Sequence, residues 1–186
     1  MNFRETLKSI GIIPVIQIND AEKAVPLALA LKKGGLPAAE GTFRTDAAEE
    51  AIRRIKIEVP DVCVCAGTVL NVKTAERAVK AGASAIIGKM ADKLSAKQIA
   101  MECGVPVIPG CATPTEVEAC MRMGLDFVKL FPAEVVGGVK MLKALGGPYG
   151  NMKFMPTGGI NAKNINSYLA FDKILACGGS WMVKKD

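Results

Sequence analysis

A lysine lies inside the apolar segment DFVKLFPAEVV, three residues before a proline. Lys129 is unusual there, because removing an ammonium group from water is costly and buried lysines are rare. An apolar environment favours the neutral amine, which can attack a ketone and form a Schiff base. The protonated imine then accepts electrons while an adjacent carbon–carbon bond is cleaved or formed. The alternative is a lysine that extends to solvent or pairs with a buried acid, and the spacing favours neither.

Other polar residues follow apolar segments in the same way. Glu40 in AEGTFRT is a candidate general acid or base, or a charge partner for a lysine. Arg44 in the same segment could bind a carboxylate through two hydrogen bonds, unless it is an ordinary surface arginine. Thr68 in AGTVL could bind the same carboxylate, although a single threonine in a glycine-flanked turn is a weak signal.

Two glycine-rich segments, PTGG and CGGSW, follow the last two apolar segments. Glycine permits positive φ and close approach of the backbone, so N–H groups at such turns can bind phosphate. The alternative is that both segments are simple turns between a strand and a helix. The candidate phosphate-binding residues are Thr157, Gly158, Gly159, Gly179 and Ser180.

The elements that must position these residues alternate along the chain, strand then helix, at a spacing of roughly 22 residues. This alternation predicts an α/β fold with a parallel sheet. Eight units favour a (β/α)8 barrel, with one domain over residues 1–186, rather than an open doubly wound sheet. The candidate residues follow strands, where barrel enzymes carry catalytic groups. Expected strands are 12–18, 38–43, 62–66, 85–88, 105–109, 127–131, 153–156 and 174–177; expected helices are 20–33, 45–57, 73–81, 95–103, 113–123, 137–145 and 161–169.

Helix-capping residues begin several of these helices: Asp20, Thr45, Ser95 and Thr113, the last followed by proline and then by a glutamate three residues on. The chain continues for only nine residues after the eighth expected strand. We therefore expect the eighth helix to be missing or truncated. Either it is absent from this chain, or a partner chain covers the last strand.

Composition excludes several classes of function. The 186 residues contain 24 Lys and Arg against 18 Asp and Glu, but the basic residues are scattered, which argues against nucleic-acid binding. The chain has no histidine, so Ser-His and Cys-His devices and the usual zinc sites are absent, and we expect no metal. No apolar run reaches the 18 residues typical of a membrane span. The first residues do not resemble a signal peptide, and the six cysteines suit free thiols in a reducing cytoplasm, so we expect a cytoplasmic protein.

The motifs together resemble the 2-keto-3-deoxy-6-phosphogluconate (KDPG) and 4-hydroxy-2-oxoglutarate (KHG) aldolases. The similarity extends over nearly the whole chain through AVPLALAL, GGLPAAE, TFRT, AGTVL, VPVIPG, VKLFPAEVVGGVK, GPYGN, FMPTGGI and ACGGSWMV. It implies a homotrimeric (β/α)8 class I aldolase without metal or cofactor. It implies cleavage of KDPG to pyruvate and glyceraldehyde 3-phosphate, and of KHG to pyruvate and glyoxylate.

The resemblance also implies roles for particular residues. Lys129 matches the Schiff-base lysine and Glu40 the general acid/base. Arg44 and Thr68 match positions that hold the carboxylate of a 2-keto acid. The positions that match the phosphate site are Gly158, Gly159, Gly179 and Ser180.

The chain departs from the family pattern at a few positions. Gly41 replaces a bulky apolar residue, Cys65 stands where many members have glycine, and Lys89 follows the fourth strand in place of a Ser-Pro-Gly-like turn. These changes suggest an engineered, C-terminally truncated member in which Gly41 opens space for another substrate. Natural divergence or a trimmed chain is the alternative.

Lys89 has several possible consequences. It could disfavour protonation of Lys129 by like-charge repulsion, become the reactive amine, block the site, or be an exposed charge of no consequence. The competing functions are therefore an engineered aldolase or retro-aldolase with an altered substrate, and a non-catalytic trimeric barrel scaffold.

Overall fold

Eight short strands alternate with helices along the chain in a computed structural model that describes residues 2–88, 98, 102 and 104–183. The strand pairings among the described residues are parallel. The strands are β1 (Ile12–Ile16), β2 (Ala38–Thr42), β3 (Cys63–Gly67), β4 (Ile86–Gly88), β5 (Val107–Cys111), β6 (Phe127–Leu130), β7 (Lys153–Phe154) and β8 (Cys177–Gly179). The helices are α1 (Phe3–Ile10), the 3-10 helix η1 (Ala21–Lys23), α2 (Ala24–Lys33), α3 (Ala48–Glu58), α4 (Val72–Lys80), α6 (Pro114–Arg122), α7 (Gly138–Gly146) and α8 (Ile165–Leu169).

The hydrogen-bonded strands follow the order β7-β6-β5-β4-β3-β2-β1-β8. Parallel bridges from Phe154 to Ile174 and from Thr157 to Gly178 also join the β7 and β8 segments. This order is that of the predicted (β/α)8 class. The expected helix at 95–103 lies almost wholly outside the described residues.

The chain divides into two compact units, residues 14–108 and residues 109–186 together with 1–13. The prediction of a single domain over residues 1–186 stays a prediction. Each unit has its own parallel strands and its own helices, and each positions a different group of the candidate residues.

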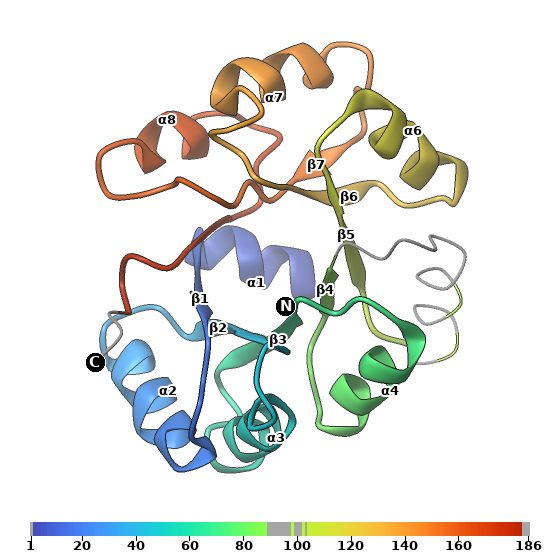
Figure 1. The fold of residues 1–186 in the computed structure, drawn as a ribbon. Helices are drawn as coiled ribbons and strands as arrows, with labels where there is room; N and C mark the ends of the chain where they lie inside the picture. The colour runs from blue at the N-terminus through green and yellow to red at the C-terminus, as the bar shows by residue number, and fades with distance from the viewer. Residues whose placement is uncertain (1, 89–97, 99–101, 103, 184–186) are drawn as a thin grey trace. The chain divides into compact units, whose positions relative to one another are not determined.

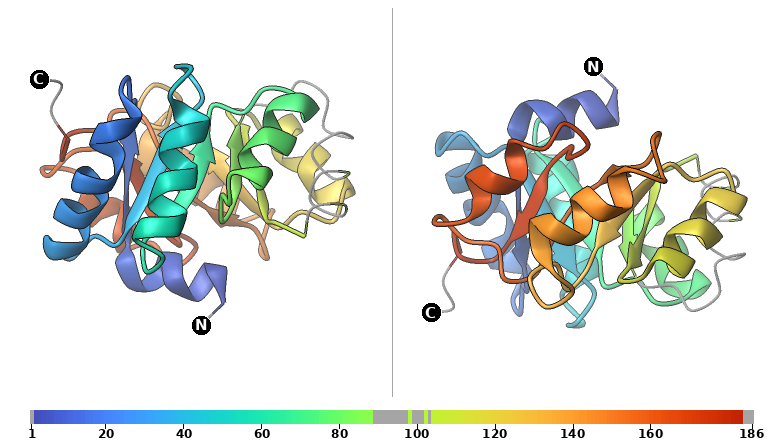
Figure 2. Two further views of the ribbon diagram at one scale, coloured as in Figure 1. Left: turned by 90° about the horizontal axis from the view of Figure 1, so that it is seen from below. Right: turned by 90° about the horizontal axis from the view of Figure 1, so that it is seen from above.

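In the 14–108 unit, helices α2, α3 and α4 pack against the strands β2 to β4 (Figure 1). Helices α2 and α3 contact each other and lie side by side in the left view of Figure 2. Apolar residues repeat along α3 at helical spacing, and Ala51, Ile52 and Ile55 are fully buried against the strands. This packing fixes β2 and β3, whose carboxyl ends carry three of the candidate residues.

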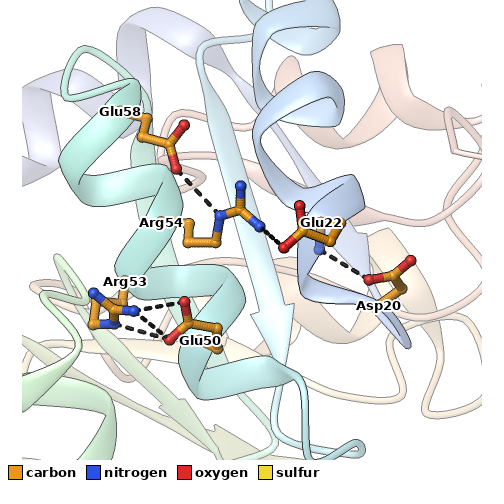
Figure 3. A network of polar contacts seen from close by, with 6 residues as sticks. All are labelled: Asp20, Glu22, Glu50, Arg53, Arg54 and Glu58. Carbon is orange, nitrogen blue, oxygen red and sulfur yellow. Dashed lines mark hydrogen bonds and ion pairs between the residues drawn. The ribbon is translucent and has the colours of Figure 1, made fainter.

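Ion pairs between charged side chains connect η1 to α3 on the surface of this unit. Arg54 of α3 contacts Glu22 of η1 at 2.6 Å and Glu58 of its own helix at 3.2 Å (Figure 3). Asp20 caps η1 by accepting a hydrogen bond from the Glu22 N–H, as the sequence predicts. Because η1 follows the carboxyl end of β1, these contacts tie the loop after β1 to α3.

In the other unit, β6 is buried along its whole length. Val128 and Leu130 belong to a core that includes Val117 of α6 and Leu142 of α7, so both face the helices. Because successive side chains of a strand point to opposite faces, Lys129 points to the other face of β6.

Helix α1 was not predicted, although the sequence carries a signal for it. Asn2 and Glu5 form a reciprocal capping box, and Gly11 ends the helix with a φ of 73°. Arg4 of α1 donates hydrogen bonds to the Asp126 carboxylate, with an Nη1 to Oδ2 distance of 2.8 Å, and lies over the Phe127 ring. These contacts hold α1 against the start of β6.

The other predicted caps have different outcomes. Thr113 and Glu116 form the expected capping box at the start of α6. The prediction for Thr45 is wrong, because α3 begins at Ala48 and the Thr45 hydroxyl instead donates to the Ile18 carbonyl. Ser95 lies outside the described residues. After β8, the described residues, which end at Val183, form no helix.

Candidate functional site

Lys129 is a buried residue at the carboxyl end of β6. Its residue is 8% exposed, and it pairs in register with Gly110 of β5. The Nζ atom lies 5.9 Å from the centre of the Phe131 ring, a cation–π contact. A primary amine that is largely shielded from water at this end of a parallel strand is in the position that barrel enzymes use for catalysis.

The turn after β7 lies directly against the segment that follows Lys129. The Ala133 N–H donates to the Thr157 carbonyl at 2.8 Å, and the Glu134 N–H donates to the Gly158 carbonyl at 3.1 Å. Gly158 and Gly159 have φ values of 100° and 81°, which favour glycine. The turn is therefore fixed next to the end of the strand that carries Lys129.

Thr157 has an unsatisfied hydroxyl. The residue is 6% exposed, and within the described part of the chain its Oγ1 atom has no hydrogen-bond partner. Leaving such a group unpaired costs roughly 1–3 kcal/mol. A side chain at Gly178 would overlap this hydroxyl, and one at Gly179 would overlap the Trp181 ring. Ser180, the next residue, is exposed.

Glu40 is a buried carboxylate on β2 in the other unit. It is 1% exposed, and its neighbour across the sheet is Cys65 of β3. A Cβ atom at Gly67 would lie 2.6 Å from the Glu40 Cγ atom and would also overlap its carboxylate. Gly67 therefore leaves the space that the Glu40 side chain occupies. A carboxyl group with little access to water exchanges protons with solvent poorly, so it can serve as a general acid or base toward a bound substrate.

Arg44 and Thr68 lie together at the carboxyl ends of β2 and β3. The Arg44 Nε atom donates a hydrogen bond to the Thr68 Oγ1 atom at 3.2 Å. Arg44 is exposed, so the rest of its guanidinium is available to an anion. Within the 14–108 unit, the structure thus brings together the two residues that the sequence suggested for binding one carboxylate.

Thr68 has a backbone conformation that its residue type disfavours. Its φ is 58°, in the left-handed region, where a β-branched side chain is strained by roughly 1–3 kcal/mol. Strain of this kind is retained where the surrounding structure enforces it, often at binding sites. The observation supports a binding role for the Thr68 hydroxyl rather than a simple turn.

Substitution of Thr68 by asparagine should stabilise the fold while impairing the site. Asparagine tolerates positive φ, so we expect the free energy of unfolding to rise by about 1 kcal/mol, which raises Tm by roughly 2–4 °C. Thermal unfolding followed by circular dichroism measures the change. The matched control is Thr115→Asn on α6, an exposed helical threonine at which no gain is expected. A lower Tm for Thr68→Asn would show that Thr68 is not strained.

Gly41 lies on the opposite face of β2 from Glu40. A Cβ atom there would lie 3.4 Å from the Ile52 Cγ1 atom of α3, which is on the helix side of the strand. A side chain at position 41 would therefore point toward α3 and away from Glu40, and the expectation that Gly41 opens space for another substrate stays a prediction. Lys89 lies outside the described residues, and each of the consequences suggested for it stays a prediction.

Two of the described cysteines, Cys177 and Cys63, have shifted pKa values, and neither is an obvious nucleophile at the carboxyl ends of the strands. Burial raises the pKa of Cys177 to about 12, so its thiol stays protonated at neutral pH. A hydrogen bond with Cys65 and the nearby Ser84 and Lys56 lower the pKa of Cys63, but Cys63 is at the amino end of β3.

Sequence reasoning missed one polar pair beside the candidate residues. The Tyr168 hydroxyl of α8 donates a hydrogen bond to the Glu134 carboxylate, which follows β6. The two residues are 34 positions apart, so no local pattern could have connected them. Within the described ranges, no cluster of three or more metal-ligating side chains occurs, and no helix is long and apolar enough to cross a membrane.

Comparison with known proteins gives consistent matches. The family model described as "KDPG and KHG aldolase" matches residues 3–186. The 2-dehydro-3-deoxy-phosphogluconate aldolase of Treponema pallidum is 45% identical over 182 residues, which cover 96% of this chain and 85% of that protein. The KHG/KDPG aldolase of Escherichia coli K12 is 44% identical over 184 residues, 98% of this chain and 85% of that protein.

A solved structure of the same kind confirms the fold class. The KDPG aldolase of Legionella pneumophila, with pyruvate captured as a covalent carbinolamine intermediate, superposes with a TM-score of 0.92 at 37% identity. The match covers 98% of this chain and 88% of that one. The predicted α/β barrel class is thus confirmed by a relative that shares more than a third of its residues.

Proposed function

This chain belongs to the KDPG and KHG aldolase family, and we propose that Lys129 is the residue on which it forms a Schiff base with a 2-keto acid. The activity is that of a class I pyruvate-dependent aldolase. It cleaves KDPG to pyruvate and glyceraldehyde 3-phosphate, and KHG to pyruvate and glyoxylate. The burial of a lysine at the carboxyl end of β6 is the observation that carries the assignment to Lys129.

The chemistry requires a neutral amine and a group that moves protons. The Lys129 nitrogen attacks C2 of the aldol substrate, and the carbinolamine loses water to give a protonated imine. The C3–C4 bond then breaks: its electrons pass into the imine to form an enamine, and the C4 hydroxyl loses its proton as the aldehyde departs. Protonation of C3 and hydrolysis of the imine release pyruvate and restore the amine.

Glu40 is the proposed proton carrier. Its carboxylate would take the proton of the C4 hydroxyl and return a proton to C3. One group can perform both steps because it is deprotonated before the first and protonated before the second. Its burial and its fixed place against Gly67 support this role, because both limit competing proton exchange with water. The family resemblance supplies the assignment itself.

The ends of the substrate are assigned to two groups of residues. Arg44 and Thr68 are proposed to bind the carboxylate of the 2-keto acid, supported by their hydrogen bond and by the strain at Thr68. The proposed phosphate site comprises Thr157, Gly158, Gly159, Gly179 and Ser180. Its support is the positive φ of the turn after β7 and the unsatisfied Thr157 hydroxyl.

We also propose that the enzyme works without a cofactor, as a homotrimer, in the cytoplasm. The absence of a cofactor follows from the Schiff-base mechanism, in which the imine formed on the lysine provides the electron sink. The homotrimer follows from the family resemblance and the cytoplasmic location from the sequence. An altered substrate would require a changed site. Of the two changes described near Glu40, Gly41 faces α3, whereas Cys65 is the neighbour of Glu40 across the sheet.

Borohydride reduction in the presence of pyruvate tests the proposal. Reduction converts the imine to a stable secondary amine, and peptide mass mapping locates it. We expect the added mass on the peptide that contains Lys129, and no addition when pyruvate is omitted. If only Lys89 is modified, the reactive amine is Lys89 and not Lys129. If neither lysine is modified, the covalent mechanism is wrong.

A further inference from the structure

The Tyr168–Glu134 pair lies next to the turn that we propose to bind phosphate, and it has a consequence for that turn. Glu134 brings a negative charge to a place where a phosphate is expected to bind. Among the described residues, Glu134 takes part in no ion pair. Its hydrogen bond from Tyr168 is therefore the contact that fixes the direction of the carboxylate.

The stem of Glu134 crosses the turn after β7. A Cβ atom at Gly159 would lie 2.6 Å from the Glu134 Cγ atom and 2.7 Å from its Cβ atom. The backbone is held equally closely, since the Glu134 N–H donates to the Gly158 carbonyl. A glutamate attached so near to the turn can reach it with its carboxylate unless another contact directs the carboxylate elsewhere.

The carboxylate itself lies at the start of α7. A Cβ atom at Gly138 would lie 2.9 Å from the Glu134 Oε1 atom and 2.8 Å from the Tyr168 hydroxyl oxygen. Gly138 is the first residue of α7, where the helix dipole favours a negative charge. The carboxylate thus lies between the first residue of its neighbouring helix, four positions on, and the hydroxyl of Tyr168, 34 positions on.

Tyr168 is well suited to hold this position. It is 1% exposed and packs in the core between α7 and α8, so its ring cannot readily move. Burial, and next the hydrogen bond to Glu134, raise the pKa of Tyr168, so its hydroxyl remains a donor throughout the neutral range. A buried tyrosine hydroxyl usually has such a partner.

We propose that Tyr168 is a positioning residue that acts through Glu134: it holds the carboxylate at the start of α7 and so keeps the 157–159 turn open to a phosphate dianion. The inference rests on the proposed function, in which this turn binds the substrate phosphate. Without the Tyr168 hydroxyl, the Glu134 carboxylate is free to approach the turn and repel the phosphate. The intact Tyr168 hydroxyl would therefore contribute to the preference of the enzyme for phosphorylated over unphosphorylated aldols.

The test compares Tyr168→Phe, Glu134→Gln and the double variant with two aldols, KDPG and the same sugar acid without phosphate. For Tyr168→Phe we expect KM for KDPG to rise by about tenfold, with kcat and the KM of the unphosphorylated aldol within about twofold of the wild type. Glutamine has no charge, so the double variant should regain a KM for KDPG close to that of Glu134→Gln. A merely structural role of the hydroxyl gives no such rescue.

Tyr149→Phe is the matched control. Tyr149 also donates from its hydroxyl to a glutamate, Glu118, at 2.7 Å, but this pair links the loop after α7 to α6. We expect this variant to keep the KM of the wild type for both aldols. Circular dichroism should show all of the variants to be folded.

The other outcomes separate the inference from the proposed function. Equal losses with both aldols, or a double variant as impaired as Tyr168→Phe, would overturn the inference while leaving the aldolase mechanism intact. The same holds if Tyr168→Phe behaves as Tyr149→Phe does. A wild-type protein that neither cleaves an aldol nor retains pyruvate after borohydride reduction would overturn the proposed function, and the inference with it.

Discussion

Replacement of Lys129 by methionine should abolish aldol cleavage, with kcat lowered by at least about 10⁴-fold. Methionine is similar in length and suits the buried position, in which the residue is 8% exposed. It has no amine, so neither the carbinolamine nor the imine can form and the electrons of the C3–C4 bond have no sink. The loss is measured by the rate of pyruvate release from KDPG.

Two further variants give this result a specific meaning. Lys129→Arg retains a positive charge without a nucleophilic amine, and it should be as inactive as Lys129→Met if the lysine acts by covalent chemistry. Lys140→Met on α7 removes an exposed lysine and should leave the activity unchanged. An arginine variant with substantial activity would mean that Lys129 stabilises charge and does not form an imine.

Substitution of Glu40 by glutamine should lower kcat by roughly 10²–10⁴-fold, because the amide cannot accept and return protons. The proton transfers on C3 can be followed separately from aldol cleavage. Wild-type enzyme in D2O should exchange the methyl protons of pyruvate through the enamine, and the variant should lose this exchange, as observed by proton NMR. Borohydride should still reduce the imine on Lys129, although more slowly.

The matched control for this experiment is Glu76→Gln, an exposed glutamate of α4 whose removal should change neither rate. A Glu40→Gln variant that is folded and exchanges the methyl protons at the wild-type rate would contradict the assignment. The proton carrier would then be another residue, and the burial of Glu40 against Gly67 would have a structural explanation.

Patterns within a few residues predicted much of this protein. The alternation of apolar segments with amphipathic ones predicted the order of strands and helices. A strand repeats its side chains at a period of 2 and a helix at a period of 3.6, so both patterns can be recognised in the sequence. The period of 2 in a strand also accounts for β6, in which Val128 and Leu130 face the helices and Lys129 lies on the other face. It also places Gly41 opposite Glu40, so the direction of Gly41 could have been inferred from its neighbour.

Local signals failed where a tertiary contact competed with them. Thr45 has the side chain of a helix cap, but its hydroxyl donates to the Ile18 carbonyl of the loop after β1, and α3 begins later. The strain at Thr68 has no counterpart in its sequence, because threonine ordinarily avoids positive φ and only the surrounding structure imposes it.

The sequence by itself determined the family, the kind of chemistry and the residues that are candidates for it, because these depend on residue types and on spacing along the chain. The tertiary structure alone decided which of those groups are shielded from water and which side chains meet. Burial depends on the packing of whole elements, and the contact between Glu134 and Tyr168 joins positions 34 residues apart. Distance along the chain carries no information about such a contact until the strands and helices are in place.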